Sequence, residues 1–264
     1  MNIFLRELKA NRKSLIIWCV ITALFVLLGI AKFSAYYNNP DMVAVLNDLP
    51  KQVLSSLNVQ AFNLTTISGF YGLMFTYYAL LLTIAAVMWG TDIITKEERD
   101  KTVEFSLTLP VTRARLVTSK TLAALVNCVA LLIFTWVASI VSAAKYQPDA
   151  AFFKFLALCM LALFIMQMVF LAAGIFLGCA MKRYKLATST AISLLLVTYF
   201  FSIITVLNSK LDFLKYFSPF KYFDPAVLLH KSTIDIAFVG LSIVIIVISM
   251  AGAYLSYSKR DLYI

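Results

Sequence analysis

The side chains best suited to chemistry lie between positions 92 and 115, around the stretch ITKEERDKTVEFSLTLPVTRARL. Acids and bases are mixed there at helical spacing, and Glu97 and Lys101 have the favourable i, i+4 order, worth about 0.2–0.5 kcal/mol. A charged helix followed by an apolar segment, a proline and a basic helix entrance suits docking to a partner, whereas the plainer alternative is a solvated loop with basic anchors. The residues expected to make such contacts are Asp92, Lys96, Glu97, Glu98, Arg99, Lys101 and Glu104.

Elsewhere the sequence offers little catalytic chemistry. The single histidine, His230, stands in a predicted loop, and the four cysteines fall inside apolar runs, where a thiol packs as a small hydrophobic group. The chain also lacks the G-x-x-x-x-G-K-[ST] loop that cradles nucleotide phosphates. We therefore expect no catalytic residue, no metal site and no cofactor in this chain.

The elements around the charged stretch are membrane spans. The sequence is 62% hydrophobic and 14% charged, whereas soluble domains are about 45–50% apolar and about 25% charged. A helix needs about 20 predominantly apolar residues to cross a bilayer. The sequence predicts an all-α membrane protein, a single transmembrane domain over residues 1–264, with six transmembrane helices at about 15–31, 69–90, 116–144, 155–181, 186–207 and 236–257.

Lysine and arginine set the predicted orientation. With the N-terminus inside, every arginine and every glutamate falls on the inner side, and only lysines remain outside. This matches the positive-inside rule. We expect both termini in the cytoplasm, a short cytoplasmic helix between spans two and three, and an interfacial amphipathic helix at the N-terminus. The alternative for residues 1–14 is an ordinary basic tail.

The spans themselves suggest packing and a polar path. Gly174 and Gly178 form a G-x-x-x-G in the fourth span, a spacing that lets helices approach closely, and we favour a partner helix in the same chain. Hydroxyl side chains run along the fifth span, either lining a pathway or interface or bonding back to helical carbonyls. The members singled out as pathway candidates are Thr190, Ser193, Thr198, Ser202 and Thr205.

The charged stretch resembles the signature of the membrane subunits of ATP-binding-cassette exporters of the type-2 permease family. The stretches FSPFKYFD at 217–224 and YSKRDL at 257–262 resemble two further family stretches, and Lys101 and Ser119 depart from the pattern, where glycine is frequent. Besides the acids at 97, 98 and 104, the matching residues are Thr102, Leu107, Leu109, Pro110, Val111, Thr112, Arg113 and Lys120.

The resemblance implies a mechanism and partners. Two permease chains, identical or homologous, would pair with two cytoplasmic ATPase subunits, which would bind ATP and magnesium. The segment 92–101 would be the coupling helix. The protein would sit in the cell membrane and bind no nucleic acid.

The segment between spans five and six is aromatic and basic. It is either an aromatic belt at the membrane interface or, as the family suggests, an outer gate with Phe217, Pro219 and Phe220. No Asp, Glu or Arg lies in the centre of any span, which disfavours ion coupling and leans toward a hydrophobic or amphipathic cargo, such as a lipid, peptide or antibiotic-like molecule. The alternatives are an ion-exporting permease of the same family, a self-contained carrier or membrane enzyme, and a non-transporting scaffold or immunity protein.

Overall fold

The protein is built from six long helices. The computed structural model describes residues 3–37, 39, 62–100 and 111–259, and these ranges contain helices and turns but no strand. Each long helix is apolar enough to cross a membrane, and none of the predicted spans extends more than one residue beyond its helix. The six are α1 (Ile3–Tyr36), α4 (Ile67–Arg99), α6 (Arg113–Ala143), α7 (Ala150–Ala180), α8 (Tyr184–Leu207) and α11 (Ile236–Lys259).

Short polar side chains start several of these helices. The side chains of Thr66, Thr112 and Asp149 accept hydrogen bonds from backbone amides in the first turns of α4, α6 and α7, which satisfies donors that a helix start leaves unpaired. The described ranges contain four further short elements, and two of them begin with a proline. They are η2 (Ala144–Tyr146), η3 (Ser209–Phe217), α9 (Pro219–Tyr222) and α10 (Pro225–Lys231).

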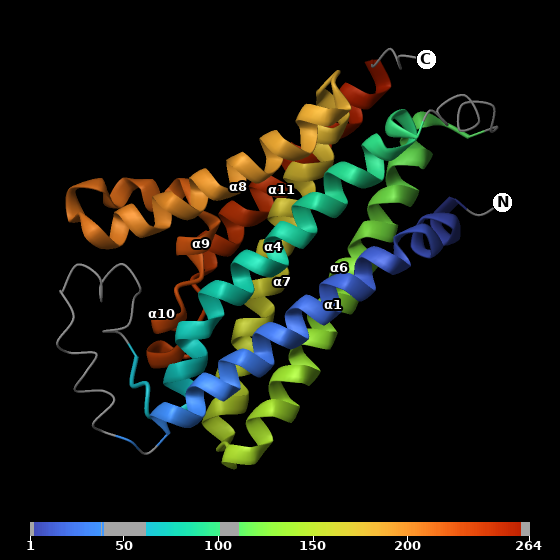
Figure 1. Cartoon of the computed structure of the whole chain (residues 1–264). Coiled ribbons are helices and arrows are strands. Elements are labelled where there is room, and N and C mark those ends of the chain that lie inside the picture. The colour runs from blue at the N-terminus through green and yellow to red at the C-terminus, as the bar shows by residue number, and fades with distance from the viewer. Residues whose placement is uncertain (1–2, 38, 40–61, 101–110, 260–264) are drawn as a thin grey trace.

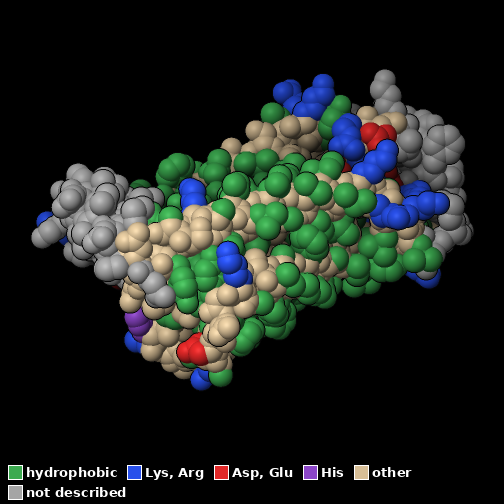
Figure 2. Space-filling model, turned by 60° about the horizontal axis from the view of Figure 1, so that its bottom comes forward, with side chains coloured by type: hydrophobic (Ala, Val, Ile, Leu, Met, Phe, Trp, Pro, Cys, Tyr) green, Lys and Arg blue, Asp and Glu red, His purple; other side chains and the backbone are tan. Residues whose placement is uncertain are grey.

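The long helices place the chain's charged segments together at one end. There α1 begins, α4 ends, α6 begins, α7 is joined to α8, and α11 ends (Figure 1). We call this the charged end and the opposite one the far end. In Figure 2, lysine and arginine gather mainly at one end, while hydrophobic side chains cover the middle of the visible face. An apolar middle between charged ends is the surface expected of a membrane protein.

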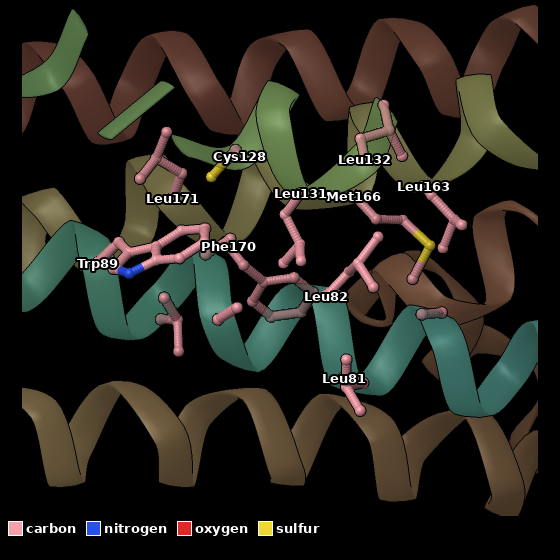
Figure 3. Close-up of a cluster of buried hydrophobic side chains, with 14 of the residues drawn as sticks. Leu81, Leu82, Trp89, Cys128, Leu131, Leu132, Leu163, Met166, Phe170 and Leu171 are labelled. Carbon is pink, nitrogen blue, oxygen red and sulfur yellow. The ribbon is translucent and has the colours of Figure 1, made fainter. Parts of the chain in front are cut away.

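The core lies around α4 and α7, which are the most buried of the long helices. Leu82 and Trp89 of α4 pack with Leu131 of α6 and with Met166 and Phe170 of α7 (Figure 3). By contrast, α1, α8 and α11 leave large apolar side chains exposed along much of their length. Such faces are suited to lipid, since burial within the protein is not available to them.

Glycines allow α4 and α7 to approach closely. A β-carbon added at Gly174 would lie 2.6 Å from the Val87 carbonyl oxygen, and one at Gly90 would lie 2.6 Å from that of Leu171. At Gly178 the added atom would lie 3.2 Å from the Thr91 carbonyl oxygen. The prediction that the G-x-x-x-G motif packs within the same chain is confirmed.

Two expectations at the charged end need correction. The predicted coupling helix is not a separate helix in its described part, because residues 92–99 are the last turns of α4, which ends at Arg99 with Asp100 as its C-cap. No proline or glycine stands between Gly90 and Asp100, so nothing in the chain breaks the helix. Likewise, the described residues of the N-terminal segment run into the first span as one helix, α1. That the segment lies in the membrane interface stays a prediction, as does the single domain.

Candidate functional site

The last turns of α4 divide the predicted coupling residues between two faces. Asp92 and Arg99 form an ion pair on the outer face, with 36% and 48% of their side chains exposed. Arg99 Nε also donates to Asp100 Oδ1 at 3.1 Å. Lys96 and Glu97 point inward, and only 14% and 8% of their side chains are exposed. The two faces are therefore available for different tasks.

The inward face forms an ion cluster with α1 and α6, which we call the charged cluster (Arg6, Glu7, Lys96, Glu97 and Lys120). Arg6 Nη2 donates to Glu97 Oε1 at 2.9 Å and to Glu7 Oε1 at 3.3 Å. Lys120 Nζ lies 3.2 Å from Glu97 Oε1, and Lys96 pairs with the second oxygen of Glu7. Three cations thus surround two carboxylates, and three helices meet in one network.

Lys120 is the deepest cation of the cluster, with 1% of its side chain exposed. Besides the Glu97 carboxylate, its ammonium group donates to the Ile93 carbonyl at 2.8 Å. A buried charge of this kind is tolerated only when it is paired and hydrogen-bonded. The family-motif lysine therefore ties the start of α6 to the end of α4.

The rest of the signature places Thr112 and Arg113 at the start of α6. Thr112 caps this helix as expected, since its hydroxyl accepts from the Arg115 amide at 3.2 Å. Arg113 Nη1 donates to the carbonyls of Tyr257 and Ser258, at 3.3 and 3.1 Å, at the end of α11. Val111 packs against the core. The remaining predicted residues lie outside the described ranges, namely Lys101, Thr102, Glu104, Leu107, Leu109 and Pro110.

Glu98 takes part neither in the outer ion pair of α4 nor in the charged cluster. Its side chain is half-buried and borders a hollow of about 700 Å³ next to the turn between α7 and α8. That turn supplies basic side chains to the same hollow: Lys182, Arg183 and Lys185. The charged end therefore presents acidic and basic groups side by side on its surface.

At the far end, the predicted gate residues separate. The Phe217 side chain is 63% exposed, whereas Pro219 and Phe220 are buried at the start of α9. Phe220 packs on Phe170 of α7 and Tyr199 of α8, with ring centroids 5.4 and 5.3 Å apart. The aromatic segment thus turns back into the helices rather than lying wholly on the surface.

Two hydrogen bonds hold this returning segment. Ser218 is fully buried, and its hydroxyl donates to the Thr198 carbonyl of α8 at 2.6 Å. The Tyr222 hydroxyl donates to the Tyr216 carbonyl, and burial raises the pKa of Tyr222 to about 12, so the donor proton is kept at neutral pH. The first bond ties the start of α9 to α8, and the second closes the segment on itself around α9.

Most of the predicted pathway hydroxyls of α8 are hydrogen-bonded to backbone carbonyls of the same helix. Thr198, Ser202 and Thr205 donate to carbonyls three residues earlier, at 2.6–2.8 Å, which confirms the predicted alternative of back-bonding. Thr190 and Ser193 are exposed on the outside of the helix. A continuous polar stripe is therefore not formed by these five residues.

One cavity nevertheless joins a pathway candidate to a gate candidate. Ser202 of α8 and Phe220 of α9 both line a cavity of about 70 Å³ toward the far end. Aromatic side chains of α4 and α8 form its walls, with the ion pair of Lys221 and Asp224 (2.6 Å) at its edge. Its lining combines apolar rings with one pair of opposite charges, which suits an amphipathic group.

The sequence reasoning missed Arg6 and Glu7. The N-terminal segment was interpreted as a basic amphipathic element, and Glu7, the only acid among the first 40 residues, was given no role. A lone acid in a basic segment is the signal that was available. It did not identify Lys96 as a partner of Glu7, because Lys96 lies on another helix far along the chain.

Comparison with known proteins decides the family. A family model described as ABC-2 family transporter protein matches residues 1–262. The chain belongs to the ABC-2 transporter family. It is therefore a multi-pass protein of the cell membrane, in a permease family whose members are transport components associated with ATP-binding-cassette subunits. No curated protein matches the chain.

Proposed function

We propose that this chain is the membrane-spanning permease subunit of an ATP-driven exporter, coupled at its charged end to separate ATPase subunits that bind ATP and magnesium. The observation that carries the proposal is the end of α4, where a helix of the buried core reaches the surface as a run of charged side chains. An ATPase that changes shape can shift the spans only through contacts that differ between its states. Such contacts are available there.

In this proposal the charged end faces the cytoplasm. Arg99 and Asp92, together with Glu98 and the turn at 182–185, present the charges that an ATPase surface would contact. A second permease chain, identical or homologous, would complete the pathway. These assignments are supported by family membership and by the concentration of arginine at this end of the described helices.

The cargo proposed is hydrophobic or amphipathic. The cavity shared by Ser202 and Phe220 supports this, because its described lining combines aromatic and aliphatic side chains with the ion pair of Lys221 and Asp224. The returning segment 218–223 would act as the outer gate, with Phe220 and Pro219 as its buried part and Phe217 outside it.

The test is the ATPase itself. We expect the tagged full chain, captured from its native membrane, to carry vanadate-sensitive ATP hydrolysis with a partner that contains a phosphate-binding loop. Glu98→Lys should reduce both capture and hydrolysis, because it places a cation beside the basic turn at 182–185. The matched control is Asp212→Lys, an equal charge change in η3 at the far end.

The opposite results would refute the proposal. If the captured wild-type chain carries no more ATP hydrolysis than a captured unrelated membrane protein, the proposed ATPase partner is refuted. If Glu98→Lys and wild type show equal capture and equal hydrolysis, the surface around Glu98 does not contact the ATPase.

A further inference from the structure

The charged cluster joins three helices that are far apart in the sequence. Arg6 and Glu7 lie on α1, Lys96 and Glu97 on α4, and Lys120 on α6. Apart from the contact between Arg6 and its neighbour Glu7, each ion pair of the cluster connects two different helices. The cluster is therefore a tertiary joint and not a set of local helix pairs.

Burial makes this joint cooperative. The side chain of Glu7 is fully buried, and those of Glu97 and Lys120 are 8% and 1% exposed. If one helix moved away alone, a buried carboxylate or ammonium group would lose its partner, and stranding a buried charge is strongly unfavourable. A movement in which the three helix ends shift together keeps these pairs intact and therefore costs less free energy.

The position of the joint relates it to coupling. Glu97 lies one residue before Glu98 on α4, so the buried joint and the proposed ATPase contact occupy adjacent positions of the same turns. Lys120 Nζ additionally holds the Ile93 carbonyl at 2.8 Å, one turn further into the helix. A push on the surface of these turns therefore acts directly on the cluster.

We propose that the charged cluster is a lock that joins the N-terminal segment to the coupling end of α4, so that α1, α4 and α6 move as one body when α4 is displaced. Arg6 and Glu7 are positioning residues in this device. They act by holding Lys96 and Glu97. The coupling role rests on the proposed function, whereas the joint motion of the three helix ends does not.

The discriminating position is the start of α6. Among the described residues Glu7 forms ion pairs with Arg6 and Lys96 but with no residue of α6, and its charge reaches Lys120 only at longer range. A purely local role for Glu7 predicts that its substitution loosens α1 and α4 only. A lock predicts that the first turns of α6 loosen as well, because Glu97 and Lys120 lose their fixed surroundings.

Hydrogen–deuterium exchange on the purified full chain, without ATPase, measures this. Glu7→Lys places a cation against Lys96, and we expect amides at 3–12, 92–99 and 116–121 to exchange at least about tenfold faster, which corresponds to about 1.4 kcal/mol of opening free energy. The double variant Glu7→Lys with Lys96→Glu restores the pair in reverse and should return all three segments toward wild-type rates. Asp92→Asn, which removes the exposed pair with Arg99 on the other face, should leave α1 and α6 unchanged.

Two results would overturn the lock. One is wild-type exchange at 116–121 in Glu7→Lys, and the other is a folded double variant that stays as loose as the single one. If Glu7→Lys does not fold, Glu7→Gln gives the same comparison with the pair removed and no charge reversed.

The coupling role is tested separately on the captured complex with its ATPase. Glu7→Gln should keep ATPase capture, because Glu7 is internal, and should lower the vanadate-sensitive hydrolysis per captured ATPase. Glu98→Lys should instead lose capture. Wild-type hydrolysis in Glu7→Gln would overturn the coupling role, whereas failure of wild-type capture would overturn the proposed function and leave the exchange result standing.

Discussion

Glu97 and Glu98 are adjacent acids that the structure assigns to different surroundings. Consecutive residues of a helix point about 100° apart, so Glu97 faces the charged cluster while Glu98 borders the hollow beside the α7–α8 turn. Reversing both charges together would therefore combine two effects, loss of a buried ion pair and a change of surface charge. The two residues should be substituted one at a time.

At the same scale, Arg113 provides a prediction about the end of α11. Its guanidinium donates to two carbonyls in the last turn of α11, those of Tyr257 and Ser258, and hydrogen bonds to charged groups contribute about 1.5–3 kcal/mol. We expect Arg113→Met to lower the free energy of unfolding by about that amount and to speed amide exchange at 255–259. Both are measurable on the purified chain in detergent.

The control for this prediction is Arg115→Met. The Arg115 side chain is exposed and forms no ion pair or side-chain hydrogen bond within the described ranges. Equal effects of the two substitutions would show that the loss of one positive charge at this end, rather than the cap on α11, is responsible.

Contacts between residues close in the sequence were predictable, whereas contacts between distant residues were not. The Thr112 cap was readable, because a cap bonds within its own first turn and leaves a local pattern. The partners of Lys120 were not, because a lysine near a span entrance has the same local pattern whether it reaches the interface or turns inward. Its burial depends on Glu97 and, through Arg6, on α1, and such long-range pairs leave no local signal.

At the scale of the elements, the contact between α4 and α7 depends on small residues. Gly174 faces the Val87 carbonyl so closely that any β-carbon overlaps backbone, which cannot rotate away. Overpacking of this kind costs about 1–3 kcal/mol. We expect Gly174→Ala to lower thermal stability and to loosen α4 against α7, measured by unfolding and by amide exchange in both helices.

Gly240 is the matched control within the same fold. A β-carbon there meets no atom within 4 Å, and alanine favours a helix over glycine by up to about 1 kcal/mol. Gly240→Ala should therefore be neutral or slightly stabilising. If both alanine variants behave alike, close approach at Gly174 is not what holds α4 to α7.

The same helix shows where prediction of elements failed. The apolar run predicts that the second span ends at about Gly90, and the charged residues after it predict a separate short helix, yet α4 continues without a break to Arg99. Gly90 serves the contact with Leu171 of α7. The six spans themselves were predictable because each needs only a long apolar run, which is a local property.

For the whole molecule, the distribution of charge is its most informative property. Arginines of the described helices lie at the charged end, while the lysines of η2, η3, α9 and α10 lie at the far end. Because basic residues are retained on the cytoplasmic side during insertion, this asymmetry supports an inward charged end. It would place the charged cluster and Glu98 within reach of a cytoplasmic ATPase.

This orientation predicts the outcome of thiol labelling in intact cells. Asp212 of η3 and Ser258 near the end of α11 are both exposed, at opposite ends of the molecule. A membrane-impermeant maleimide should label Asp212→Cys in intact cells, and should label Ser258→Cys only after permeabilisation. The unsubstituted chain is the control for its own thiols, of which Cys128, Cys159 and Cys179 are buried. The reverse labelling pattern would show that the charged end faces outward. A cytoplasmic ATPase could not then reach the end of α4, so this result would also refute the proposed coupling.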